Sequence, residues 1–207
     1  MTASEFAENS EERPDPRVER SRAKLLSAAT ELLVEAGPRA LTVDNVAERS
    51  GVAKSTLYRH WPSRTALMID VFRANMPCTP MIDPSQGFEP CLREYMRALA
   101  DSIGDPEWAR MLPALFALRQ QLPEVDDLTE ADHDEKVAVM RAVLDRGVAE
   151  GLIPEGLDPR AVALTLVGPM MMCAIAGDPE ATLAAGDFAL DRFLASYRGR
   201  GGAGDPA

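Results

Sequence analysis

The chain has 207 residues, of which 46% are hydrophobic, 5% aromatic and 27% charged, and its formal net charge is −11 at pH 7. This composition excludes a disordered or collagen-like chain, and the scarcity of aromatic residues favours helices over sheet. No apolar run is long enough to span a bilayer, because Gly168 and Pro169 interrupt the best candidate, so we expect no membrane partner.

Cysteine and histidine usage argues against a metal site or redox chemistry. Cys78, Cys91 and Cys173 are odd in number and lack CxxC spacing, which favours reduced thiols in a bacterial cytoplasm. The acidic N-terminus shows no signal-peptide core, so we expect no export. With His60 and His133 as the only histidines, we expect neither metal nor cofactor. Without paired carboxylates, a Ser-His-Asp set or a Gly-rich phosphate loop, we predict no catalytic residues and no enzyme.

The acidic net charge is unevenly distributed. Residues 17–75 carry ten Arg and Lys against six acidic residues, a net +4, whereas residues 1–16 carry −4 and residues 76–207 carry −11. Affinity for nucleic acid needs a local basic face and not a basic chain. The net charge therefore leaves residues 17–75 open to nucleic-acid binding.

The first expected helix follows an acidic, polar stretch, residues 1–14, that predicts a disordered tail. Asp15-Pro16 starts the helix, and Gly37-Pro38 ends it after a run of apolar residues at helical spacing. This helix is the expected platform for the next two. Four basic residues near its start are either phosphate contacts or a solvated face: Arg17, Arg20, Arg22 and Lys24.

Two short helices joined by a glycine turn come next. Thr42 is the expected N-cap of the first, and Gly51 is suited to the left-handed position after it. The second, roughly Lys54 to Trp61, has only Leu57 and Trp61 as large apolar residues on one face. Two short helices joined by a tight turn, with a polar second helix, form the helix-turn-helix pattern. The alternative is a helical hairpin with a solvated, mildly basic face.

From about Arg20 to Phe72 the segment resembles, without gaps, the DNA-binding domain of the tetracycline-repressor (TetR/AcrR) family. The matching residues are Thr42, Gly51-Val52, Thr56-Leu57-Tyr58, Trp61 and Arg64. The resemblance implies a regulator that binds double-stranded DNA at a palindromic operator as a homodimer. It also implies a small-molecule effector between the helices of the C-terminal domain.

The polar residues of the second short helix and its flanks fall into two groups, according to whether they can reach base edges or the phosphate backbone of DNA. Ser55, Thr56 and Arg59 are candidates for base edges, Arg59 being best suited to guanine. Ser63 caps a further helix, whose first turn places Arg64 beside N–H groups that favour an anion. The candidates for phosphate contacts are Thr42, Lys54, Tyr58, His60 and Arg64. For His60 the alternative is a surface histidine without a contact.

The fold class predicted is all-α, with an N-terminal three-helix helix-turn-helix DNA-binding domain and a larger C-terminal helical ligand-binding and dimerisation domain. Residues 75–90 contain four prolines, so we place the boundary there, between domains 15–75 and 76–198. The helix around Met68 to Phe72 is the hypothesised hinge. The Gly-rich residues 199–207 predict a second disordered tail.

The C-terminal half predicts further helices, with an acidic connector from Pro123 to Asp134. The helix from Pro159 to about Ala176 is apolar nearly all round, so burial against a second subunit is the simplest account. The resemblance likewise implies that the last two helices pack across a two-fold axis. Candidate interface residues are Val162, Leu166, Met170, Phe188 and Phe193.

Pro113 should kink its helix, which either opens a cavity between helices or leaves a packed kink. The resemblance implies an effector cavity between the helices of this domain. Its candidate residues, with ordinary core as the alternative, are Trp108, Met111, Phe116, Met140, Met170 and Met171. Methionines adapt to varied apolar shapes, which favours a lipophilic effector. We therefore predict a repressor released by such a ligand. The alternative is a regulator of the same fold without an inducer, either an activator or one controlled by a partner, whose core would be filled.

Overall fold

The computed structural model describes residues 16–83 and 85–198, and within these ranges every regular element is a helix. The predicted tails at 1–14 and 199–207, and Asp15 as a cap, lie outside the described residues. The elements are α1 (Pro16–Ala36), η1 (Pro38–Ala40), α2 (Val43–Ser50), α3 (Lys54–His60), α4 (Arg64–Asn75), α5 (Phe88–Ile103), α6 (Pro106–Arg119), α7 (Pro123–Ala149), α8 (Pro159–Ile175), η2 (Pro179–Ala181) and α9 (Thr182–Tyr197). The all-α prediction is confirmed, and none of these helices is both long and apolar enough to cross a bilayer.

The chain divides into two compact units, the first ending at Met68 and the second starting at Ile69. The division falls inside α4, earlier than the boundary expected from the proline-rich stretch. Residues 77–83 form no helix, as their prolines predict. The division between the units nevertheless lies before them, within the continuous helix α4.

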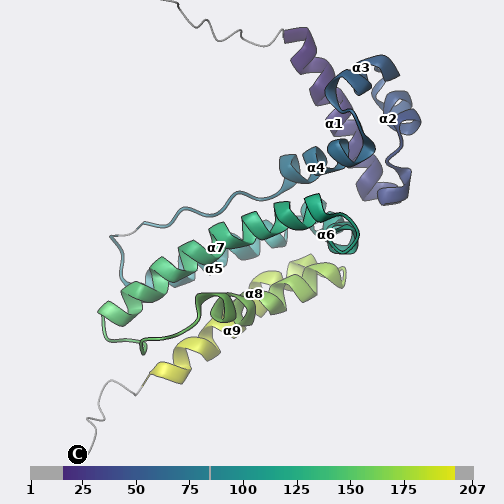
Figure 1. Cartoon of the computed structure of the whole chain (residues 1–207). Coiled ribbons are helices and arrows are strands. Elements are labelled where there is room, and N and C mark those ends of the chain that lie inside the picture. The colour runs from purple at the N-terminus through teal and green to yellow at the C-terminus, as the bar shows by residue number, and fades with distance from the viewer. Residues whose placement is uncertain (1–15, 84, 199–207) are drawn as a thin grey trace, which may run out of the picture. The chain divides into compact units, whose positions relative to one another are not determined.

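The first unit is built on α1, which packs against α2 and α3 (Figure 1). Leu25 and Leu33 of α1 are buried together with Val46 of α2 and Leu57 of α3. At the surface, Arg49 Nη1 lies 2.7 Å from a carboxylate oxygen of Glu35 and so links α2 to α1. Helix α1 is the platform that its apolar spacing predicts.

Caps fix the ends of the short helices. The backbone N–H of Asn45 donates to Thr42 Oγ1 at 3.2 Å, and Gly51 adopts a left-handed φ of 66° at the end of α2. The N–H of Ala66 donates to Ser63 Oγ at 3.1 Å, at the start of α4. These are the predicted helix boundaries.

Arg64 ties the start of α4 to the segment that precedes α2. Its Nε donates to the carbonyl of Leu41 at 2.7 Å, and its guanidinium also donates to the carbonyl of Pro38. The carbonyl of Pro38 also accepts the backbone N–H of Leu41 at 3.2 Å, so the guanidinium reinforces the 3₁₀ turn that leads into α2. Arg64 therefore has a structural role inside the first unit.

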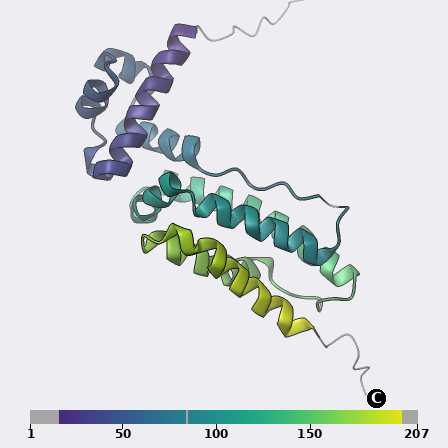
Figure 2. The same cartoon turned by 180° about the vertical axis from the view of Figure 1, so that it is seen from behind.

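The second unit has two layers, as Figures 1 and 2 show from opposite sides. Helices α5 and α7 run side by side in one layer, and α8 and α9 pack against each other in the second. Helix α6 contacts both α7 and α8. Fully buried side chains such as Tyr95, Met111, Met140 and Leu166 fill the space between the layers.

The expected acidic connector is helical, because α7 begins at Pro123 and runs unbroken to Ala149. Proline suits a first helical turn, and Glu124 and Asp126 stand where acidic side chains interact favourably with the helix dipole. Farther along, Lys136 pairs with Asp132 four residues earlier. The acidity that suggested a loop instead stabilises the start of a helix.

Helix α8 finds partners for its inner side within its own chain. Val162, Leu166 and Met170 are at most 7% exposed and lie in the core, which corrects their assignment to a subunit interface. The physical reason is that α9 and α7 already cover this face. Met172, at 63% exposed, lies on the outer side instead, whereas Leu164, at 61% exposed, also borders the cavity of this unit.

Two helix-interior glycines should differ in their response to alanine. An alanine Cβ at Gly147 would lie 2.7 Å from Phe88 Cδ2 and 2.9 Å from Ile153 Cδ1, whereas at Gly168 it would meet nothing within 4 Å outside its chain neighbours and its own helix backbone. We expect Gly147→Ala to lower the free energy of unfolding by about 1–3 kcal/mol. Gly168→Ala should change it by only about 0.5 kcal/mol, because the entropy gained over glycine is offset by crowding of the new Cβ against the following Pro169. Urea unfolding followed by circular dichroism measures both, and equal effects would contradict the close packing at Gly147.

Arg64→Lys should lower the free energy of unfolding by about 1–2 kcal/mol, because one ammonium cannot replace a guanidinium that serves two carbonyls. Arg39→Lys is the matched control, since Arg39 is exposed and forms no ion pair with any described residue. Thermal unfolding of the two variants makes the comparison. A loss of the same size for both would remove the structural role from Arg64.

Candidate functional site

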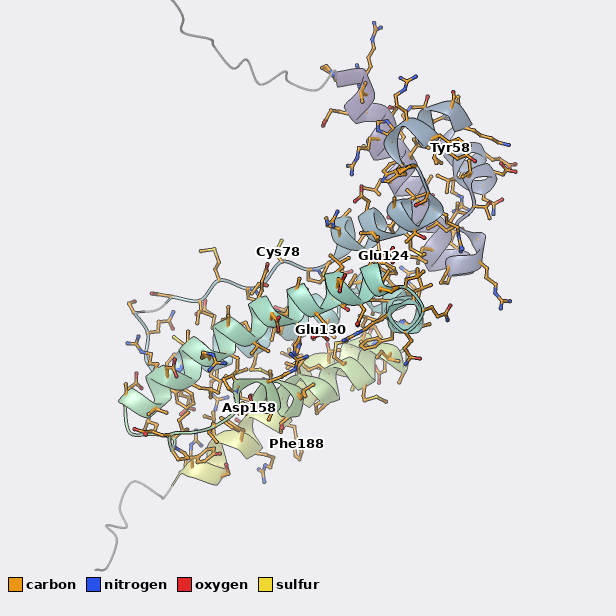
Figure 3. All side chains as sticks on the ribbon, in the orientation of Figure 1. Tyr58, Cys78, Glu124, Glu130, Asp158 and Phe188 are labelled. Atoms are coloured by element: carbon orange, nitrogen blue, oxygen red, sulfur yellow. The ribbon has the colours of Figure 1, made fainter. Side chains whose placement is uncertain are left out.

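Helix α3 presents a polar face to solvent. Leu57 and Trp61 are 1% and 2% exposed, so they anchor the helix and take no part in recognition. The exposed residues on the other side include Ser55 and Arg59, and the phenol of Tyr58 is 57% exposed, as Figure 3 shows. Thr56 is half-buried beside them. Hydroxyls and a guanidinium on one short helix suit the edges of base pairs.

Two of the phosphate candidates already have partners within the unit. Thr42 caps α2, so its hydroxyl oxygen is occupied as an acceptor. Lys54 Nζ lies 2.6 Å from Asp44, and this hydrogen bond, together with the charge of the carboxylate, raises the pKa of Lys54. Both members of the pair are well exposed, so the attraction is weak in water. A phosphate can therefore take the place of Asp44.

His60 is held against α1. Its Nε2 lies 3.3 Å from Ser21 Oγ, and its ring stacks at an angle on Trp61, with centroids 5.4 Å apart. Burial lowers the pKa of His60, and the neighbouring guanidinium groups of Arg22 and Arg59 lower it further. The imidazole is thus a neutral link between α1 and α3, a role that its place in the polar helix did not reveal.

Arg22 adds a second link between α1 and the end of α3. Its guanidinium carbon lies 5.4 Å from the centroid of the Trp61 ring, within the range of a cation–π contact. From its place near the start of α1, Arg22 is expected only to contact phosphate or to lie on a solvated face. Arg22 and Trp61 lie far apart in the sequence, so a pattern of local spacing cannot predict their contact.

The second unit contains a cavity of about 410 Å³. Its wall combines Leu99 of α5, Leu112 of α6, Val137 of α7 and Val167 of α8, all apolar, with the predicted residues Trp108, Phe116 and Met171. Met111, Met140 and Met170, which were also predicted, are not in this wall and pack in the core instead. The volume lies within the range of about 300–1,000 Å³ typical of small-molecule sites.

Charged side chains gather at one part of the cavity wall, and they neutralise one another. Arg119 pairs with Asp126 at 2.6 Å and also with Glu130, which in turn accepts from Arg160 at 2.8 Å. The hydrogen bond from Arg160 is the largest cause of the lowered pKa of Glu130. In Figure 3, Glu130 lies on the side of α7 nearest to α8. The network therefore joins α6, α7 and α8.

Near this network the wall holds uncharged polar groups. Burial raises the pKa of Tyr95, whose hydroxyl stays protonated and donates to the carbonyl of Lys136 at 2.9 Å. Thr129 Oγ1 donates to the carbonyls of its own helix. His133 also borders the cavity, although the sequence analysis considered it only as a metal ligand. Among the described residues, no group of three or more His, Cys, Asp or Glu is placed to hold a metal ion.

An apolar surface runs over α8 and α9. Leu164 and Met172 on α8 and Phe188 on α9 are between 61% and 68% exposed, and Leu183 is 36% exposed. Figure 3 shows Phe188 on the outer side of α9. Phe193, the remaining interface candidate, is half-buried and packs edge-on against Tyr197. Of the predicted interface residues, Phe188 alone is well exposed.

Each of the two units is matched by a model of a known protein family. The family model described as bacterial regulatory proteins, tetR family, matches residues 25–71, and the model described as tetracyclin repressor-like, C-terminal domain, matches residues 91–192. These ranges contain α3 in the first case and most of the cavity wall in the second.

Two curated relatives and one solved structure illustrate the similarity. The chain is 46% identical over 57 residues to the uncharacterized HTH-type transcriptional regulator YdeS of Bacillus subtilis, a match that covers 28% of this chain and 29% of that protein. It is 25% identical over 161 residues to the HTH-type transcriptional regulator AqdR of Rhodococcus erythropolis, covering 78% of this chain and 77% of that protein. The flavonoid-responsive regulator FrrA shares the fold, with a TM-score of 0.65 and 21% identity over 86% of this chain and 97% of that one. The chain therefore belongs to the TetR family, and it is a DNA-binding transcriptional regulator and not an enzyme.

Proposed function

We propose that this protein is a cytoplasmic repressor that binds a roughly palindromic operator as a homodimer and is released by a small lipophilic effector. The observation that carries the proposal is the presence, in one chain, of an exposed polar helix α3 and a separate apolar cavity of about 410 Å³. The first supplies a DNA contact, and the second supplies a place for a signal.

On the DNA side, Arg59 is the residue best placed for base readout. It is exposed on α3 and forms no ion pair with any described residue, so its guanidinium is available to a guanine. Lys54 and Tyr58 supply phosphate contacts at the same helix. Thr42, His60 and Arg64 support the interface mainly through the contacts that they make within the unit.

The homodimer is supported by the apolar surface of α8 and α9. Large apolar side chains exposed together on two packed helices are typical of an interface and unusual on a free surface. A homodimer has two α3 helices, one from each subunit, to offer to one DNA duplex. Half-sites about 34 Å apart, or a small multiple of that spacing, then account for a palindromic operator.

The cavity favours an effector over the alternative of a regulator without one. A filled core was the feature expected of that alternative, and a space of about 410 Å³ is instead present between α5, α6, α7 and α8. The name of FrrA describes a flavonoid-responsive protein of the same fold, which supports a ligand of similar apolar character here.

Release from DNA requires that the effector bind the non-DNA conformation more tightly than the DNA-bound one. We place the hinge of this change at Met68 to Phe72. These residues of α4 span the division between the two units, so a shift of one unit can reach the other through a continuous helix.

Replacing Arg59 should separate base readout from phosphate contact. We expect Arg59→Ala to weaken operator binding by about 1–3 kcal/mol and to relax the preference at one base position, while binding to random DNA changes little. The operator is first selected from a pool of random duplexes with the wild-type protein. Fluorescence anisotropy then gives both affinities.

Lys54→Ala is the matched control on the same helix, and it should weaken operator and random DNA alike. Equal losses on both DNAs for Arg59→Ala would remove Arg59 from base readout.

Phe188→Glu should disrupt the dimer, because it places a charge in the apolar surface of α8 and α9. We expect sedimentation to show a monomer at low micromolar concentration and operator binding to be lost. Leu152→Glu is the control, since Leu152 is 50% exposed but lies outside these helices. A Phe188→Glu protein that remains dimeric would place the interface elsewhere.

A further inference from the structure

His133 on α7 holds a polar atom that the protein does not satisfy. Its ring borders the cavity, and its Nε2 is buried without a hydrogen-bond partner among the described residues. A buried polar atom without a partner destabilises the folded chain, so such atoms are rare. In a cavity wall, this atom indicates a partner that arrives from outside the chain.

The charges of the same wall indicate what that partner is not. Each charged side chain in the wall already has an opposite charge within the protein: Arg119 and Arg160 share Glu130, and Lys136 pairs with Asp132. An anionic ligand would stand beside two carboxylates, and a cationic one beside three basic groups. A charged ligand of either sign would lose its hydration on entering the cavity and would find no unpaired opposite charge there, so its binding is unfavourable.

Other polar groups of the wall differ from this nitrogen. The hydroxyls of Tyr95, Thr129 and Ser102 already donate their protons to backbone carbonyls. The rest of the wall is mainly apolar, although the indole N–H of Trp108 and the thiol of Cys78 belong to it. Among the described residues, His133 is the one whose side chain holds a buried polar atom without a partner, so it is the group from which we expect a hydrogen bond to a ligand.

We propose that the effector is an uncharged, largely apolar molecule with one hydroxyl or carbonyl group, and that His133 Nε2 forms the hydrogen bond to that group. One imidazole tautomer accepts a hydrogen bond at Nε2 from a hydroxyl, and the other donates one to a carbonyl. The proposal rests on the proposed function, since it takes the cavity to be the effector site.

A matched set of biphenyls tests this chemistry. The full-length protein is first loaded with N-phenyl-1-naphthylamine, a neutral probe that fluoresces in apolar surroundings. Displacement of the probe then gives dissociation constants for 4-phenylphenol, biphenyl, biphenyl-4-carboxylate and 4-phenylbenzylammonium. We expect 4-phenylphenol to bind about two- to ten-fold more tightly than biphenyl, as one net hydrogen bond provides, and at least on the order of ten-fold more tightly than either ion.

Two variants of His133 locate the hydrogen bond. His133→Phe keeps a planar ring and removes the nitrogen, so the advantage of 4-phenylphenol over biphenyl should vanish. His133→Gln restores an amide with a donor and an acceptor and should restore part of the advantage. Because Nε2 has no partner in the chain, His133→Phe should melt no lower than the wild type, which separates recognition from folding.

The outcomes separate this inference from the proposed function. If the probe binds but an ion competes as well as 4-phenylphenol, or if His133→Phe keeps the preference for the phenol, the effector class is wrong and the cavity remains a ligand site. If the wild-type protein binds neither the probe nor any biphenyl, the cavity is not an effector site, and both proposals fall.

Discussion

A helix as short as α3 has little stability of its own, because nucleating a helix fixes several residues before hydrogen bonds accumulate. Its shape depends on burying Leu57 and Trp61 against the first unit. That burial decides which side of α3 remains free, and the free side carries Arg59 and Tyr58. The ring of Trp61 also contacts the imidazole of His60 on α3 and the guanidinium of Arg22 on α1, and these contacts hold the end of α3 against α1. The proposed contact of α3 with DNA thus depends on a small apolar contact on the opposite side of the helix.

In the second unit, ion pairs between helices determine the character of the cavity wall. Arg119, Glu130 and Arg160 come from three different helices, and their ion pairs fix one part of the cavity wall. Partly exposed ion pairs contribute little to stability one by one. Their effect here is to leave the wall with no unpaired charge, which makes the cavity suited to neutral molecules. In the proposal made above, the buried nitrogen of His133 forms the hydrogen bond to the polar group of such a molecule.

Local signals in the sequence predicted the parts of the fold that local chemistry controls. Thr42, Gly51 and Ser63 mark helix ends because a cap needs only its nearest neighbours. The acidic start of α7 was misread, since Glu124 and Asp126 are equally suited to a loop and to a helix start, and only the tertiary structure decides between them. The inner residues of α8 were assigned to a second subunit because apolar periodicity does not reveal whether the cover belongs to the same chain. The contacts of Arg64, Arg22 and His60 join distant segments, so no spacing pattern could show them.

We propose that this protein recognises a particular DNA sequence through two copies of α3. Fluorescence anisotropy of the wild-type protein on the DNA upstream of its own gene, against random DNA of equal length and over a range of salt, is the direct measurement. We expect preferential binding to the upstream DNA at a stoichiometry of one dimer per site, with an affinity that falls steeply as salt rises. Equal, weak binding to both DNAs at every salt concentration would contradict recognition of this site.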